Sequence, residues 1–324
     1  EDEVPAELRA QRSLNLSRIP EIAAYIADHP DSYVLSALTA SVGATVTFDP
    51  FVEEGPRSNL GMLHIPMDAS ILINDGQHRR AAIEEALKER PELGQDNIPV
   101  LFFIDEGLKR SQQMFADLNK HAIRPSDSIS TLYDHRDEAS NLARYLAMTV
   151  PEFIGTTEME KSSISHRSTK LFTLSSIKNA TKALLRKGRR QPISEEEQQL
   201  ALDFWTAAAS HMPDWTSVKA RKVNPSELRQ NFVHVHGVTL HALGIVGRSL
   251  TASHPKNWAE RLKPLETMDW ARANTDLWEG RAMQMGKISK ARNNVHLTAN
   301  AIKKHLGLTL TPEDEALEEE FTRG

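Results

Sequence analysis

The sequence predicts an α+β protein, with an α/β N-terminal domain followed by a mainly α-helical C-terminal domain. In the first half, short apolar runs alternate with helical patterns, which is typical of a mixed sheet packed with helices. From about residue 134 the apolar spacing changes to the helical 3.6-residue period and strand patterns nearly vanish. The predicted boundaries are 1–133 for the α/β domain, 134–311 for the helical domain and 312–324 for an acidic tail.

The elements of the α/β domain follow from the order of these patterns. A first helix, with Ser17 as its cap, buries Ile22 and Ile26 and ends near Pro30. A later helix over residues 77–90 buries its alanine-rich side. The run IPVLFFI at residues 98–104 is apolar on both faces, which predicts a strand at the centre of the sheet. The other predicted elements are strands at 33–38, 44–48, 62–65 and 71–73 and a helix at about 108–119.

The helical domain is predicted from its apolar period and its end signals. Ser194 and Glu197 form a capping-box pattern before one of the helices. The five tryptophans, which all lie in this half, are interpreted as core or interface anchors and not as base-stacking platforms. The predicted helices cover residues 136–148, 174–187, 195–211, 235–250, 258–268, 270–283 and 288–306.

The composition excludes several classes of protein. The 324 residues are 40% hydrophobic and 26% charged and include no cysteine, so thiolate chemistry, disulfides and cysteine-based metal sites are excluded. No apolar run approaches the roughly 20 residues needed to cross a bilayer, and we expect the cytoplasm as compartment and no membrane partner. His234, His236 and His241 do not form an HExxH pattern, and no metal site is predicted.

The net charge of −5 is unevenly distributed along the chain. Residues 1–160 carry 14 Lys and Arg against 27 Asp and Glu, a balance of −13. Residues 161–311 carry 24 against 11, a balance of +13. The tail 312–324 has 1 against 6, a balance of −5. A basic block of this size in an acidic chain favours a polyanionic partner such as nucleic acid.

A strand, a tight turn and a helix are predicted in immediate succession over residues 71–83. Free backbone N–H groups and the positive end of the helix dipole meet at such a turn. This helix carries His78, Arg79 and Arg80 in its first turn, where acids are normally favoured, at a cost of about 0.3–1 kcal/mol per cation without a bound anion. The pattern therefore indicates a phosphate or nucleotide contact. The alternatives are solvated side chains, with Asp75 simply capping the helix, and a purely structural role for His78 or Arg79.

The motif Asp75-Gly76-Gln77-His78-Arg79 resembles the DGQHR signature of the DndB family, which belongs to the bacterial DNA phosphorothioation (sulfur modification) system. Three further segments are similar to that family: QRSLN at 11–15, FADLNK at 115–120 and KSSISHRSTKLFTLSSIKNATKALL at 161–185. The resemblance covers residues 11 to about 310. It implies a ParB/sulfiredoxin-like fold for the N-terminal domain and a repressor-like regulator that binds the promoter of the modification genes.

The same resemblance implies an alternative function. Related folds bind nucleoside triphosphates at the corresponding turn, and related restriction proteins hydrolyse them. In that case the protein would be an NTPase using a nucleoside triphosphate with Mg, and Asp75, His78 and Arg79 would be catalytic. A regulator without enzymatic activity is the first expectation. The residues implied to bind nucleotide or phosphate are Asp75, Gly76, Gln77, His78, Arg79, Arg80 and Asn119.

The expected partners are double-stranded DNA, other phosphorothioation proteins and a second copy of the chain. The segment 161–190 contains nine cations and no acid, with serines and threonines that can hydrogen-bond phosphates. We interpret it as the DNA contact; a solvated basic face is the alternative. The candidate DNA-binding residues are Lys161, Arg167, Lys170, Lys178, Lys182, Arg186, Lys187, Arg189 and Arg190.

Two further segments have interpretations that concern DNA. The helix containing residues 287–304 has an outer basic side, and Asn293, Asn294 and Asn300 would read base edges if it entered a major groove; an amphipathic surface helix explains the same pattern. The tail 312–324 is expected to be a solvated acidic end, with competition for the basic face as the alternative.

Overall fold

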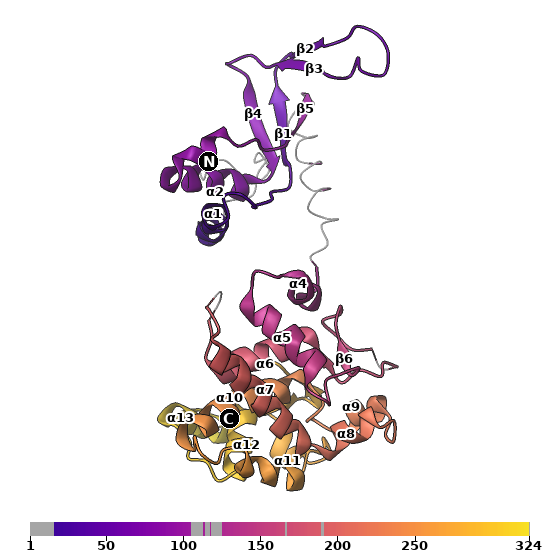
Figure 1. The fold of residues 1–324 in the computed structure, drawn as a ribbon, viewed down its shortest axis with the longest axis vertical. Coiled ribbons are helices and arrows are strands. Elements are labelled where there is room, and N and C mark those ends of the chain that lie inside the picture. The colour runs from indigo at the N-terminus through magenta and orange to yellow at the C-terminus, as the bar shows by residue number, and fades with distance from the viewer. Residues whose placement is uncertain are drawn as a thin grey trace. The chain divides into compact units, whose positions relative to one another are not determined.

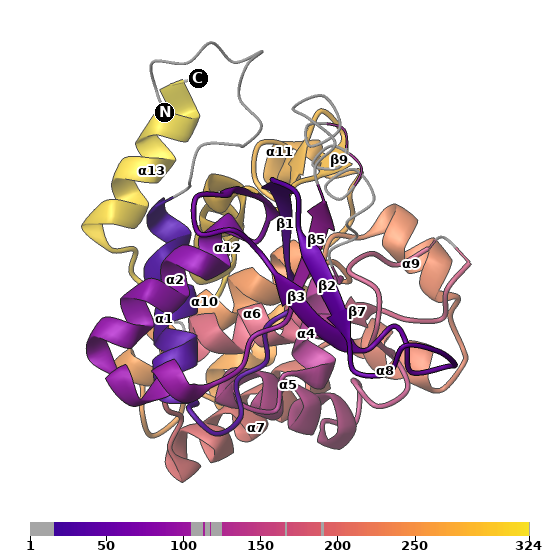
Figure 2. The ribbon, with the colours of Figure 1, turned by 90° about the horizontal axis from the view of Figure 1, so that it is seen from above.

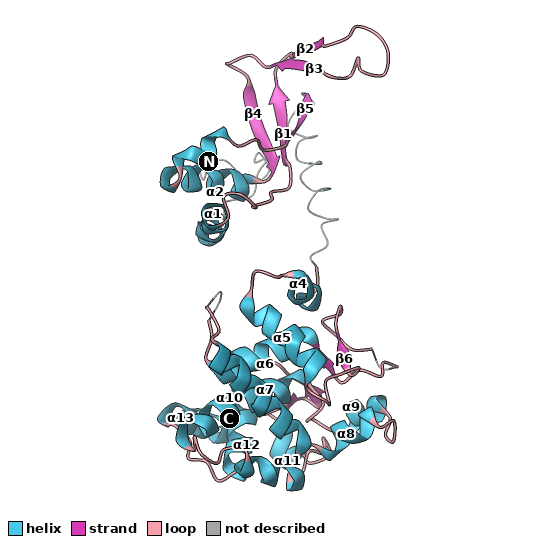
Figure 3. Ribbon diagram, in the orientation of Figure 1, coloured by secondary structure: helices cyan, strands magenta, loops and turns pink. Residues whose placement is uncertain are grey.

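The computed structural model describes residues 16–104, 113, 117, 125–165, 167–188 and 191–323 (Figure 1). The chain divides into two compact units, Glu1–Ile123 and Arg124–Gly324, which we call unit 1 and unit 2. The division precedes the sequence-based boundary at residue 133. The largest sheet lies in unit 1, whereas unit 2 is mainly helical (Figure 3). The predicted α+β class is therefore confirmed.

Unit 1 contains a three-stranded mixed sheet of order β4-β1-β5. Strand β1 pairs antiparallel with β4 and parallel with β5. Strands β2 and β3 form a separate antiparallel hairpin, at the opposite end of the unit from α1 and α2 (Figure 1). The elements are η2 (Leu16–Arg18), α1 (Ile19–Asp28), β1 (Leu38–Gly43), β2 (Thr47–Pro50), β3 (Gly61–His64), β4 (Ser70–Asp75), α2 (Gln77–Glu89), η3 (Pro91–Gln95) and β5 (Val100–Ile104).

Helices α1 and α2 lie side by side and form the small core of unit 1 (Figure 2). Ala23 and Ile26 of α1 meet Ala82 and Ala86 of α2, and these small side chains allow the two helices to approach closely. The predicted cap of α1 is wrong by one residue. The helix begins after Arg18, and no side chain caps it.

The predicted central position of the IPVLFFI strand is also wrong. Among the strands that the structure describes, β5 lies at an edge, since only β1 pairs with two neighbours. Leu101 remains 52% exposed. The apolar run is equally compatible with an edge strand whose faces are not both covered, so the run alone does not fix the strand's position. The predicted helix at 108–119 and the segment 11–15 fall outside the described residues, apart from positions 113 and 117.

Unit 2 is built almost entirely from helices with two short strand pairs. Within the described ranges, no helix is long and apolar enough to cross a membrane. The elements are α4 (Asp127–Tyr133), α5 (Glu138–Thr149), β6 (Thr157–Glu158), β7 (Phe172–Thr173), α6 (Leu174–Leu185), α7 (Glu195–Ser210), α8 (Pro213–Lys219), α9 (Pro225–Asn231), α10 (Gly237–Ser253), η4 (Glu260–Thr267), α11 (Thr275–Trp278), β8 (Met283–Gln284), β9 (Lys287–Ile288), α12 (Arg292–His305) and α13 (Pro312–Arg323).

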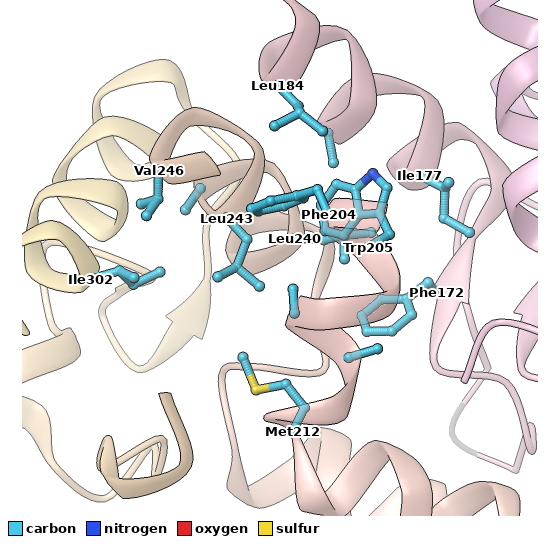
Figure 4. Close-up of a cluster of buried hydrophobic side chains, with 14 of the residues drawn as sticks. Phe172, Ile177, Leu184, Phe204, Trp205, Met212, Leu240, Leu243, Val246 and Ile302 are labelled. Atoms are coloured by element: carbon cyan, nitrogen blue, oxygen red, sulfur yellow. The ribbon is translucent and has the colours of Figure 1, made fainter. Parts of the chain in front are cut away.

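Helix α10 occupies the centre of the unit 2 core, between α6 and α12 (Figure 4). Two glycines allow this close packing. A Cβ atom at Gly244 would lie 2.1 Å from the carbonyl oxygen of Ala180, and one at Gly247 would lie 2.4 Å from the ring of Phe204. The core interpretation of the tryptophans is confirmed for the described structure: Trp205, Trp215, Trp270 and Trp278 are buried, and Trp258 packs against the same core half-buried.

Most of the predicted helices of unit 2 are present, and the capping box of Ser194 and Glu197 is confirmed. The prediction was wrong for residues 258–283. The first of these two helices is the 3-10 helix η4, which contains Pro264. The second is reduced to the four residues of α11. Asp269 accepts a hydrogen bond from the backbone of Ala271 and fixes a turn where the predicted helix would start, and α11 begins only after its cap Asn274.

The acidic tail is a folded helix and not a solvated end. Helix α13 packs against α12, and Asp314 Oδ2 lies 2.6 Å from Lys303 Nζ in a buried ion pair. Glu318 binds Arg281 through both carboxylate oxygens and also accepts from Lys304. The guanidinium of Arg281 stacks over the ring of Phe321. The tail is thus held by the cations of its own unit.

Candidate functional site

The DGQHR segment forms the turn between β4 and α2. Strand β4 contains a bulge at Asn74, since Asp75 pairs with Thr39 while Ile73 pairs with Ala40. The next residue, Gly76, has φ of 101°, a left-handed conformation that favours glycine. A Cβ at Gly76 would also lie 2.5 Å from Leu38 Cδ2. Glycine is therefore required here by both conformation and space.

Asp75 does not cap α2, which corrects that alternative. The N-cap residue is Gly76, and no side chain caps the helix. Asp75 Oδ2 instead accepts a hydrogen bond of 2.6 Å from Arg79 Nη2. Arg79 also donates to the backbone carbonyl of Ser36, and Arg80 pairs with Glu84 at 3.0 Å. Both arginines of the motif region therefore already have a carboxylate partner, which reduces the excess positive charge expected from the sequence.

Gln77 and Asn74 have structural positions in the turn. Gln77 Nε2 donates to the carbonyl oxygens of Ile73 and Asn74, which ties the helix start back to the strand. Asn74 is fully buried and donates to Ser41 Oγ at 2.5 Å. Its Oδ1 atom has no hydrogen-bond partner in the described structure.

A cleft of about 450 Å³ opens at this turn. The N-terminal part of α1 forms one wall, the start of α2 forms another, and residues 34–36 complete it. Burial and the nearby Arg18 lower the pKa of His78, while Asp75 acts in the opposite direction. The imidazole is therefore mainly neutral at pH 7. The lining residues are Arg18, Ile22, Tyr25, Val34, Leu35, Ser36, Asp75, Gly76, Gln77, His78 and Arg79.

The cleft brings five of the seven predicted phosphate-site residues together. Arg80 is not among the described lining residues, and Asn119 lies outside the described part of the chain. The donors present are Arg18, His78, Arg79 and the first backbone N–H groups of α2, which suit a phosphate group. Mg²⁺ is usually held by one or two carboxylates together with phosphate oxygens. Asp75 is the one carboxylate among the described lining residues, so a metal would need the nucleotide for most of its ligands.

The predicted DNA face of unit 2 is divided by internal ion pairs. Lys178 Nζ lies 2.6 Å from Asp137 Oδ2 at the start of α5, with its side chain 22% exposed, so the expected outer position of this lysine is wrong. Lys187 pairs with Glu197 at 2.8 Å. Lys170 donates to the carbonyl oxygen of Gly155. Arg189 and Arg190 lie outside the described residues.

Four of the predicted DNA contacts have side chains without such partners. The side chains of Lys161, Arg167, Lys182 and Arg186 make no ion pair or hydrogen bond with any residue that the structure describes. Lys161 and Arg167 lie in the loop 161–170 that precedes α6, whereas Lys182 and Arg186 lie at its C-terminal end. Most of α6, a helix of 12 residues, lies between the two groups in the sequence.

Arg229 of α9 holds the loop 161–170 in place. Its guanidinium donates to the carbonyl oxygens of Ser165, Ser168 and Lys170, and the residue is 8% exposed. Burial lowers the pKa of this guanidinium. No sequence signal points to this role, because Arg229 stands in an ordinary polar helix and its partners are backbone atoms about 60 residues away.

The second DNA candidate, residues 287–304, does not have the expected surface. Asn294 and Asn300 are buried and donate to backbone carbonyl oxygens inside the unit, so they are not free to read bases. Lys303 is buried in its pair with Asp314. The helix also starts only at Arg292. Asn300 and Lys303 are buried because α13 covers this side of α12, whereas Asn294 is held by Gly280 and Arg281. The amphipathic pattern reveals neither contact.

His234, His236 and His241 each face a different environment. His234 Nε2 lies 3.1 Å from Asp214, and His236 Nε2 lies 2.9 Å from the carbonyl oxygen of Arg229. His241 is near His296 and Lys290, which lower its pKa in addition to burial. Across the described residues, no group of three or more His, Cys, Asp or Glu side chains is arranged to hold a metal ion.

Comparison with known proteins agrees with the motif. Residues 1–309 match the family described as DndB, DNA-sulfur modification-associated. The chain belongs to this family. No curated protein and no solved structure matches the chain. The match places the protein in DNA sulfur modification, and it includes both the DGQHR cleft and the basic loop 161–170.

Proposed function

We propose that this member of the DndB family is a DNA-binding, repressor-like regulator of the phosphorothioate modification genes. Unit 2 would contact the promoter through Lys161 and Arg167 on the loop and through Lys182 and Arg186 at the end of α6. The observation that carries this proposal is the contrast between paired and unpaired cations. Lys178 and Lys187 are neutralised by acids of their own unit, but these four are not.

The placement of the four cations suits a duplex. The four cations form two groups, one on the loop before α6 and one near the C-terminal end of that helix, and each group can neutralise DNA phosphates. The loop is held by hydrogen bonds from Arg229 to its carbonyl oxygens, which reduces the entropy lost on binding. Phosphate contacts of this kind give affinity and orientation but carry little sequence information.

The test is a mobility-shift titration of the promoter duplex at about 50 and about 200 mM salt. Removing one cation that neutralises a DNA phosphate should reduce the log–log salt slope by about 0.9. Lys161→Ala combined with Arg167→Ala should therefore weaken binding and lower the slope by nearly two such steps. The matched control is Lys256→Ala, an exposed lysine beyond the C-terminal end of α10, which should bind like the wild type. Binding that is absent, or insensitive to salt and to the double substitution, would refute the proposal.

A second candidate function, nucleoside triphosphate hydrolysis, is favoured by the cleft at the DGQHR turn. Its volume lies within the usual range for small-molecule sites, and Arg18, His78 and Arg79 can contact phosphates. In this interpretation Arg79 clamps a phosphate, neutral His78 serves as acid or base, and Asp75 contributes one ligand to Mg²⁺. We also infer a ParB/sulfiredoxin-like fold for unit 1. The mixed sheet and the position of the motif between β4 and α2 support it.

Phosphate release from ATP, GTP and CTP, with and without DNA, tests this second candidate. Arg79→Ala should abolish release if the cleft is the active site. Arg90→Ala, at the other end of α2, is the matched control and should leave it unchanged. Release that is equal in all three proteins would remove the cleft from the reaction.

A further inference from the structure

Three helix starts of unit 2 lack acidic residues. The first turns of α6, α10 and α12 contain no Asp or Glu. Each of the other α-helices that the structure describes in unit 2 has at least one acid there. An acid in the first turn complements the positive end of the helix dipole. The positive dipole ends of α6, α10 and α12 are therefore not compensated by an acid in their own first turns.

The starts of α6 and α10 meet at Gly237, and the side chain of a lysine that precedes α12 reaches the same place. A Cβ at this first residue of α10 would lie 2.5 Å from Ser176 Oγ in the first turn of α6. The same Cβ would lie 2.8 Å from Nζ of Lys290, two residues before α12. The backbone N–H groups of Gly237 and Val238 have no acceptor among the described residues, and no side chain caps the helix. An ammonium, a hydroxyl and two unused N–H groups thus adjoin each other.

The side chains around Lys290 are cationic or can become so. His236 Nε2 and Arg272 Nη1 both point at the carbonyl oxygen of Arg229, at 2.9 and 3.3 Å. Burial lowers the pKa of His236 to about 4, and Arg272, Lys290 and Arg229 add to that effect. A second histidine near Lys290 is His241, which is also near His296. The groups acting on His236 and His241 include no carboxylate.

Lys290 differs from two other lysines that lie among the packed helices of the unit. Lys178 and Lys303 each have a carboxylate within 2.6 Å. The amine of Lys290 has no hydrogen bond or ion pair with a described residue, although its surroundings lower its pKa by burial. Its side chain remains accessible to solvent, so a ligand can reach it. Like charges gathered at three helix starts are unfavourable until an anion joins them.

We propose that Lys290, Ser176 and the first N–H groups of α10 form a binding site for a phosphate group in unit 2. The ligand is either a free phosphate-class oxyanion or a phosphate of a DNA backbone, since both present the same tetrahedral oxygens. The site is separate from the DGQHR cleft, which belongs to unit 1. It requires neither DNA binding through the loop 161–170 nor nucleotide hydrolysis.

The first arm of the test uses the full chain and radiolabelled inorganic phosphate in equilibrium dialysis. We expect saturable binding that becomes roughly ten- to hundredfold weaker in Lys290→Ala, because a charge-assisted hydrogen bond is removed. Lys256→Ala, the same change at the far end of α10, should bind like the wild type. Melting in phosphate-free buffer provides a folding control. Lys290→Ala should be no less stable than the wild type, since it relieves repulsion, and Lys290→Gln serves as a second variant.

The second arm uses a DNA duplex in mobility shifts and distinguishes the two sources. Weaker DNA binding by Lys290→Ala across all sequences, with competition by inorganic phosphate, identifies a backbone phosphate. Unchanged DNA binding together with weakened phosphate binding identifies a free anion. The proposal is overturned if Lys290→Ala binds phosphate and DNA as tightly as the wild type, or if the wild type binds neither. DNA binding that depends on Lys161 and Arg167 but not on Lys290 would leave the proposed function standing without this site.

Discussion

The two ends of helix α12 have opposite electrostatic arrangements. At the C-terminal end, Lys303 and Lys304 face Asp314 and Glu318 of α13. At the N-terminal end, Lys290 has no carboxylate partner in the described structure and lies among histidines and arginines. Both ends look equally basic in the sequence. The comparison shows that a positive segment can be a buried internal contact or a place for a ligand, and that only the tertiary partner distinguishes them.

The largest expected effect on stability comes from breaking the ion pairs at the C-terminal end of α12. Asp314→Ala leaves Lys303, 3% exposed at its side chain, as a buried charge without a partner. We expect the free energy of unfolding to fall by about 3–5 kcal/mol in urea denaturation. The matched control is Glu319→Ala, which removes an exposed pair with Arg323 on the same helix and should cost less than about 1 kcal/mol. Equal losses in the two variants would contradict the burial argument.

Low pH should selectively weaken the contact of α13 with Arg281 and with the C-terminal end of α12. Burial alone would raise the pKa of Glu318, but hydrogen bonds from Arg281 and Lys304 outweigh it and lower the pKa to about 2. Because the folded pKa lies below the unfolded value near 4.5, this carboxylate contributes stability above that pH. The contribution is lost as the pH falls from about 4.5 towards 2. Urea midpoints measured over this range should fall less steeply for Glu318→Gln than for the wild type; parallel curves would contradict the assignment.

A smaller effect on stability is expected from a substitution in the first turn of α12, close to Lys290. Asn294 donates to the carbonyl oxygens of Gly280 and Arg281 at 3.0 and 2.7 Å and accepts from Ser289. Asn294→Ala should cost about 1–3 kcal/mol in urea unfolding while DNA affinity stays unchanged. Its exposed neighbour offers the control, since Asn293→Ala should change stability by less than about 0.5 kcal/mol. Loss of DNA affinity in Asn294→Ala without loss of stability would restore the base-reading hypothesis.

Local patterns were enough to predict the elements with strong periodicity. The strand–turn–helix at the DGQHR motif, the helices α5, α6, α7 and α10 and the capping box depend on neighbouring residues. Their physical causes can therefore be recognised in a short window. Gly76 illustrates this at the site, because a tight turn directly before a helix already favours glycine, and the structure shows its positive φ.

Features that depend on distant partners were not predictable. The partner of Asp75 was not predictable either, although it is only four residues away: Asp75 binds Arg79 instead of capping α2, and the sequence allowed both. The burial of Asn300 depends on α13, and the fixed loop 161–170 depends on Arg229. The position of β5 at the sheet edge depends on which strand pairs with β1. In each case several partners were compatible with the sequence, and the packing of the whole unit selects one.

The packing of α13 has a practical consequence for recombinant fragments. The family match ends at residue 309, whereas α13 begins at Pro312. A protein expressed only to the end of the matched region would lack Asp314 and Glu318 and would leave Lys303 and Arg281 with buried charges. We expect such a fragment to express poorly or aggregate. Deletion experiments on the acidic tail would then measure misfolding and could be mistaken for a role of the tail in DNA binding.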